Sequence, residues 1–163
     1  CCVGPRLRQA WWVVVWVRFV AGGLPLAAEM RGWLLAQDCL QTLIDLNPAQ
    51  TSAEVVRSMF DYLPIEGGNG ALIRAMADPA IRIVGLTVTE SGYYIDPVSK
   101  GFDAGHADIV HDASNPETPR TSFGAIVAAL RLRRDAGQRP FTGLSCHHLQ
   151  GNGVLLPPTV SLL

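Results

Sequence analysis

Segments with the pattern of strands alternate with segments that have the pattern of helices in the second half of the chain, and this alternation constrains the fold most. Short apolar runs are typical of strands, and apolar residues that recur every three or four positions are typical of a helix face. Alternation of this kind predicts an α/β domain with a mostly parallel sheet flanked by helices. We expect strands at residues 81–89 and 141–146, and helices at residues 71–77 and 118–136.

The expected core follows from the same two periodicities. Its candidates on the first strand and on the longer helix are Ile83, Val84, Leu86 and Val88, and Phe123, Ile126, Val127, Leu130 and Leu132. Gly137 is placed to end that helix, because glycine readily adopts the left-handed conformation found at helix C-termini. The cluster of Arg131, Arg133 and Arg134 just before it is expected to form a solvated helix end.

The first half of the sequence contains an apolar run near its start. Residues 11–20 are rich in valine and tryptophan, which is typical of a strand buried on both faces. The alternatives are sequence foreign to the domain and a signal peptide, which Arg6 and Arg8 loosely imitate. Further along we expect a helix at residues 26–36, strands at 39–46 and 53–63, a loop at 64–70, and an irregular excursion at 90–115 with a short helix near 107–113.

The composition excludes two classes of partner. Hydrophobic residues make up 48% and charged residues 17% of the 163 residues, which suffices for one ordinary domain with a core. The formal net charge of -1 leaves no basic excess to neutralise phosphates, so we expect no nucleic-acid partner. Arg18 interrupts the apolar run, which is shorter than the roughly 20 residues of a membrane span, so we expect no membrane partner. The four cysteines include no C-x-x-C pair, and reduced thiols fit a cytoplasmic protein.

Two segments are placed to form a ligand site. Ligands of parallel sheets bind beyond the carboxyl ends of strands, and residues 87–93 and 145–153 follow two of the expected strands. A metal site is suggested by five side chains, Cys146, His147, His148, His106 and His111. Neighbouring residues in an extended chain point to opposite sides, however, and no second close-spaced pair is present. We therefore predict no metal site.

These segments resemble the mannitol dehydrogenase family, which comprises long-chain polyol dehydrogenases together with fructuronate and tagaturonate reductases. The resemblance runs over residues 78–153 and extends back to about residue 24. The matching strings are LTVTESGYYIDP at 86–97, HADI at 106–109, NPETPRT at 115–121, GAIVAALR at 124–131, PFTGLSC at 140–146 and GNG at 151–153.

The resemblance implies a partial Rossmann-type domain that binds NAD or NADP and is joined to a mostly helical substrate domain. The implied reaction is metal-independent hydride transfer between the nicotinamide and a mannitol-type polyol or keto sugar, with a hexuronate reductase as the alternative. The implied catalytic residues are Glu90 and His148, and the implied cofactor-binding residues are Thr87, Thr89, Glu90, Ser145 and Cys146. Without such roles, Glu90 would cap or solvate a turn, and Thr87 and Thr89 suit a strand in any case.

The sequence departs from the family's pattern at three points. A G-x-G-x-x-G phosphate loop, which lets backbone amides approach the pyrophosphate, does not occur. His148 stands where the family has an asparagine that helps to stabilise oxyanion character on the substrate oxygen. The family's general base lies in a Lys-x-x-x-x-Asn-x-x-His helix, whereas the one lysine here, Lys100, is followed by neither residue at those offsets. We therefore expect no independent turnover by this chain.

The expected organisation is a partial cofactor domain between two atypical ends. We place an atypical apolar segment at residues 1–23, the domain at 24–153 and an atypical tail at 154–163, with the substrate domain absent. One hypothesis for both ends is out-of-frame or truncated sequence around a genuine middle. The rival interpretation is a non-catalytic binding or interaction module that exposes three tryptophans, Trp11, Trp12 and Trp16.

Overall fold

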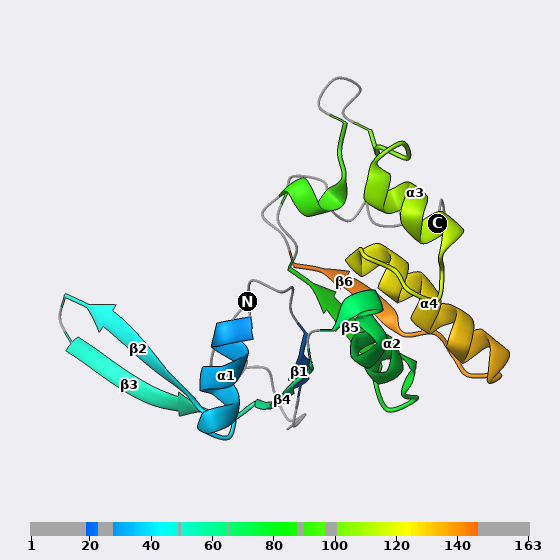
Figure 1. Ribbon diagram of the computed structural model, residues 1–163. Coiled ribbons are helices and arrows are strands. Elements are labelled where there is room, and N and C mark those ends of the chain that lie inside the picture. The colour runs from blue at the N-terminus through cyan, green and yellow to red at the C-terminus, as the bar shows by residue number, and fades with distance from the viewer. Residues whose placement is uncertain are drawn as a thin grey trace. The chain divides into compact units, whose positions relative to one another are not determined.

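The chain folds into two compact units, Cys2–Ile65 and Glu66–Leu163, and each is described by itself. The structure is a computed structural model that describes residues 19–22, 28–48, 50–64, 66–87, 90–96 and 101–146 (Figure 1). Within these residues, no helix is both long and apolar enough to cross a membrane.

The amino-terminal unit contains a parallel strand pair and one helix. Strand β1 (Phe19–Ala21) pairs in parallel with β4 (Met59–Tyr62), and Leu63 N–H donates to the carbonyl of Ala21 at 2.8 Å. The predicted helix is confirmed as α1 (Ala28–Ala36), whose Arg31 Nε donates to the carbonyls of Tyr62 and Leu63. A small core forms from the buried Leu34, Cys39 and Tyr62. Residues 11–18, most of the predicted first strand, lie outside the described residues.

A β-hairpin occupies the middle of the same unit. Strands β2 (Gln41–Asn47) and β3 (Gln50–Val56) pair antiparallel, and Asn47 lies opposite Gln50 at the turn (Figure 1). The expected single strand at 53–63 is wrong: the ladder with β2 ends at Val56, and β4 starts at Met59 to pair with β1 instead. Ile44, Leu46 and Val55 are exposed.

The carboxy-terminal unit is built on a second parallel pair. Strands β5 (Ile83–Leu86) and β6 (Thr142–Ser145) run side by side, with Leu86 opposite Ser145 at their ends. Helices α2 (Gly70–Ala77) and α4 (Ser122–Asp135) lie next to each other, as Figure 1 shows. Their shared core with β5 consists of Ile73, Met76, Leu86, Tyr93, Phe123, Ala125, Ile126, Ala128, Ala129 and Phe141. The two predicted helices and two predicted strands of this region are therefore present. Helix α4 and both strands are shorter than predicted, whereas α2 begins one residue earlier.

Three sequence predictions in this unit are wrong in detail. Ile83 is 62% exposed, because successive strand residues face opposite sides and the core lies on the side of Leu86. Leu132 is 48% exposed, since the helix turn brings its neighbour Arg133 to the core instead. The expected loop at 64–70 contains a 3-10 turn, η3 (Gly67–Asn69), and its last residue begins α2.

Arg133 is a buried structural residue, which corrects the expectation of a solvated position. Its side chain is 3% exposed, whereas Arg131 and Arg134 in the same turns are exposed as predicted. The guanidinium lies 5.1 Å from the centre of the Phe141 ring. It donates to four backbone carbonyls, those of Met76, Asp78, Ile81 and Arg139. One side chain thus joins the end of α2 to the segments that lead into β5 and β6.

A buried carboxylate holds the start of α4. Asp112, on helix α3 (Ala107–Ser114), accepts hydrogen bonds from Arg120 N–H at 2.7 Å, Thr121 N–H at 2.9 Å and the Thr121 hydroxyl at 2.6 Å. The Thr121 oxygen in turn accepts from Gly124 N–H and caps the helix. Burial raises the pKa of Asp112, but these bonds and the contact with His111 outweigh it, so the pKa lies below its ordinary value.

Candidate functional site

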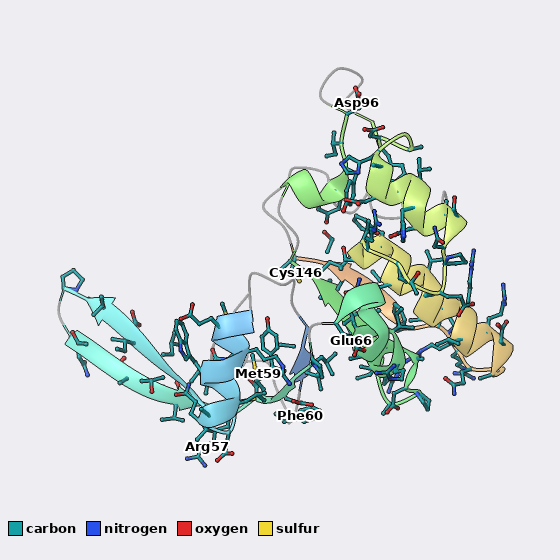
Figure 2. All side chains as sticks on the ribbon, in the orientation of Figure 1. Arg57, Met59, Phe60, Glu66, Asp96 and Cys146 are labelled. Carbon is teal, nitrogen blue, oxygen red and sulfur yellow. The ribbon has the colours of Figure 1, made fainter. Side chains whose placement is uncertain are left out.

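The candidate site lies at the carboxyl edge of the parallel β5–β6 pair. Both strands end here because they run in the same direction, and Leu86 and Ser145 are direct neighbours across the ladder. The next residue of β6 continues the pairing, since Cys146 N–H donates to the carbonyl of Leu86 at 2.9 Å. Figure 2 labels Cys146 at this edge. Two chain segments that are almost 60 positions apart are thereby brought to one place.

Tyr93 is a buried residue that contacts this edge. It is the last residue of the 3-10 turn η4 (Glu90–Tyr93) and is 1% exposed. Its ring centre lies 5.6 Å from that of Phe123, with the two planes tilted by 51°. Its hydroxyl shares a hydrogen bond of 2.6 Å with the Ser145 side chain. The turn after β5 and the end of β6 are therefore joined by a side-chain bond as well as by the ladder.

The structure describes four of the six predicted site residues. Thr87 directly follows β5 and is exposed, Ser145 and Cys146 are half-buried at the end of β6, and Glu90 begins η4. The edge thus brings together Thr87, Ser145 and Cys146 from two separate segments. Thr89 and His148 lie outside the described residues.

The sequence indicated no role for the Tyr93 hydroxyl. Tyr93 packs in the core, and its hydroxyl also has a partner, Ser145, 52 positions away in the chain. A contact between residues so far apart in the chain leaves no local pattern in a single sequence. The signal that does exist is indirect, because both residues fall inside the segments expected at the carboxyl ends of strands.

Tyr94, the residue directly after η4, has an unusual backbone conformation. Tyr94 has a φ of 52°, in the left-handed region that bulky residues rarely adopt, and its carbonyl accepts from Asp103 N–H at 2.7 Å. Its ring packs edge-on against His106 at 4.7 Å between centres. Burial, followed by the charges of Asp108 and Asp112, raises the pKa of Tyr94. This phenol therefore stays protonated at neutral pH and is not available as a base.

The histidines in the described residues have structural partners. His106 Nδ1 accepts from Asp108 N–H at 3.2 Å at the start of α3, and His111 Nδ1 lies 3.2 Å from a carboxylate oxygen of Asp112. Within the described ranges, no group of three or more histidine, cysteine, aspartate or glutamate residues could hold a metal ion. Since His147 and His148 are outside those ranges, the absence of a metal site stays a prediction.

Comparison with known proteins identifies the family. Residues 9–161 match the family model described as the mannitol dehydrogenase Rossmann domain. A mannitol 2-dehydrogenase of Cereibacter sphaeroides is 56% identical over 138 residues, which are 85% of this chain and 29% of that protein. A polyol:NADP oxidoreductase of Gluconobacter oxydans (strain 621H) is 44% identical over 72% of this chain and 24% of its own length.

Solved structures agree with the sequence match. The Pseudomonas fluorescens mannitol 2-dehydrogenase, in a ternary complex with NAD and D-mannitol, superposes with a TM-score of 0.81 at 38% identity, over 88% of this chain and 30% of that one. A substrate-free D-sorbitol dehydrogenase gives 0.79 at 36% identity, again over 88% and 30%. The chain thus spans less than a third of the length of these relatives. The predicted Rossmann-type α/β fold is confirmed, and the chain belongs to the mannitol dehydrogenase family.

Proposed function

We propose that this chain is the nicotinamide-binding part of an NAD(P)-dependent polyol oxidoreductase of the mannitol type. The observation that carries the proposal is the parallel β5–β6 edge, where Leu86 and Ser145 end side by side. In open α/β sheets, ligands bind beyond the carboxyl ends of strands. The relatives add the chemistry, since those quoted above are mannitol 2-dehydrogenases, a polyol:NADP oxidoreductase and an enzyme solved with NAD and D-mannitol. As part of this proposal, residues 24–153 form the cofactor-binding portion.

The side chains at this edge fit the carboxamide group of a nicotinamide ring. Thr87 and Ser145 carry small hydroxyl groups, which both donate and accept hydrogen bonds, as a carboxamide requires of its partners. Cys146 is a small, half-buried residue that follows Ser145 at the end of β6. Thr87, Thr89, Glu90, Ser145 and Cys146 are proposed to bind the cofactor.

Bound NAD or NADP would supply the hydride acceptor or donor. The chain's own contribution is to bind the cofactor and to hold polar groups next to the reacting carbon. Glu90 is proposed to exchange a proton near the nicotinamide, because a carboxylate at a strand end is placed for acid–base work. His148 is proposed to donate a hydrogen bond to the substrate oxygen from a ring nitrogen.

Titration with NADH tests the proposal. Under reducing conditions, the folded chain is expected to change the fluorescence of NADH saturably, and a parallel titration with NADPH separates the two cofactors. Thr87→Ala should weaken binding by roughly 2- to 10-fold, the effect of losing one hydrogen bond.

The matched control is Thr142→Ala. Thr142 is also exposed but lies at the opposite end of the same strand pair, so its removal should leave the affinity unchanged. No saturable signal with either cofactor at millimolar concentration, from a chain with a native circular dichroism spectrum, would refute the proposal.

A further inference from the structure

We propose that the Tyr93 hydroxyl is a positioning group that orients Ser145 toward the nicotinamide end of the cofactor. This inference rests on the proposed function and deepens it. It names a residue that need not touch the cofactor and acts through its hydrogen bond to Ser145.

The position of the Tyr93 hydroxyl is determined by packing. The ring is 1% exposed, lies against Phe123 and belongs to the core that also contains Leu86 from β5. A buried ring in a close-packed core has little freedom to move. The phenol oxygen at its tip is therefore held in place independently of any ligand.

Ser145, by contrast, has a short side chain that can rotate and that is partly accessible to solvent. It is half-buried, and its hydroxyl rotates among three staggered positions unless a partner selects one. The 2.6 Å contact with Tyr93 is such a partner. Either hydroxyl can donate in this contact, and the phenol is the more acidic of the two. With the phenol as the donor, the Ser145 proton remains available for an acceptor such as a carboxamide oxygen.

Tyr93 also belongs to the turn that begins with Glu90, so its ring and its hydroxyl have separable roles. The ring anchors η4 in the core through Phe123, and phenylalanine would preserve that contact. Tyr93→Phe therefore removes the bond to Ser145 and leaves the turn anchored.

The experiment compares Tyr93→Phe, Ser145→Ala and the double variant by NADH titration, with the emission spectrum of the bound dihydronicotinamide as a second readout. Tyr93→Phe is expected to weaken NADH binding by roughly 2- to 10-fold and to shift the bound emission toward that of free NADH. The double variant should bind no more weakly than Ser145→Ala alone, because the two hydroxyls act as one unit.

Met76→Leu is the matched control. Met76 is also a buried core residue, 5% exposed, but Arg133 joins its carbonyl to the segments that precede β5 and β6, at the opposite end of these strands from Ser145. This variant should leave both readouts unchanged. Thermal unfolding of all variants, followed by circular dichroism, measures any loss of stability separately.

The outcomes distinguish the inference from the function it rests on. If the unaltered chain binds NADH and Tyr93→Phe binds it with the same affinity and emission, the positioning role is refuted while the proposed function stands. Additive effects of the two substitutions would likewise overturn it. If Tyr93→Phe fails to fold, a native-like Ser145→Ala must show the weaker binding and the emission shift, and its failure to do so refutes the inference. Absence of binding by the unaltered chain would overturn the function and the inference together.

Discussion

Replacing Arg133 with methionine should destabilise the carboxy-terminal unit strongly. Methionine retains a long apolar stem in the core but removes all four hydrogen bonds to the carbonyls of Met76, Asp78, Ile81 and Arg139. A hydrogen bond from a charged donor contributes about 1.5–3 kcal/mol. The contributions of the four hydrogen bonds are not additive, because residues such as Asp78 and Arg139 are exposed and their carbonyls can bind water instead. Met76 is buried, so its carbonyl loses its partner outright.

A loss of about 3–5 kcal/mol of unfolding free energy follows, because the charged hydrogen bonds are lost and the buried Met76 carbonyl is left without a donor. The assay is urea unfolding followed by helical circular dichroism at 222 nm. All four tryptophans precede residue 34, so their fluorescence would report on the amino-terminal unit instead. Three of the described α-helices, α2, α3 and α4, belong to the unit under test.

Arg131→Met is the matched control for this prediction. Arg131 lies on the same helix but is exposed, so its replacement should change the unfolding free energy by no more than about 0.5 kcal/mol. If Arg133→Met unfolds within about 1 kcal/mol of the control, the four carbonyl bonds do not stabilise this unit as argued.

Two further predictions concern the start of α4. Gly124→Ala should destabilise by about 1–3 kcal/mol in urea unfolding, because an added Cβ would collide with Asp112 Oδ2 and lie 2.7 Å from Pro119 Cβ. The control is Gly32→Ala on α1, where an added Cβ meets no atom within 4 Å. This variant should raise the unfolding free energy by about 0.5–1 kcal/mol, and a change of the same sign in both variants would contradict the argument. The pKa of Asp112 is lower in the folded than in the unfolded chain, so the ionised carboxylate stabilises the fold. This contribution to the unfolding free energy is fully present above the unfolded pKa of about 4, and it is lost as the pH falls from there through the folded pKa. Asp112→Asn should reduce this loss of unfolding free energy at acid pH, measured by urea unfolding at a series of pH values. An unchanged loss would exclude Asp112 as its source.

Local patterns predicted the elements of the second half well. The helix periodicity placed α4, the proline after Asp78 marked the end of α2, and the short apolar runs placed β5 and β6. Gly137 has a φ of 67°, as expected for a residue that ends a helix. Such signals succeed because they depend on steric and periodic properties of neighbouring residues.

The candidate site was predicted in part, because the carboxyl ends of parallel strands share an edge once the strands pair. That argument predicted that Thr87, Ser145 and Cys146 lie at one edge of the sheet, and the paired ends of β5 and β6 bring them there; their role in binding stays a prediction. It could not assign a partner to Tyr93, since the bond to Ser145 depends on how the core orients the ring.

The sequence by itself determined the alternation of helices and strands, the apolar faces of the helices and the family resemblance. Only the tertiary structure decided that Arg133 is buried while Arg131 and Arg134 are exposed. The physical reason is that a guanidinium can be buried only where several carbonyls converge on it, and two of these, of Met76 and Ile81, come from residues 57 and 52 positions away. Likewise, the Tyr93 hydroxyl acquires its partner only when β5 and β6 pair, because that pairing brings Ser145 within hydrogen-bond distance.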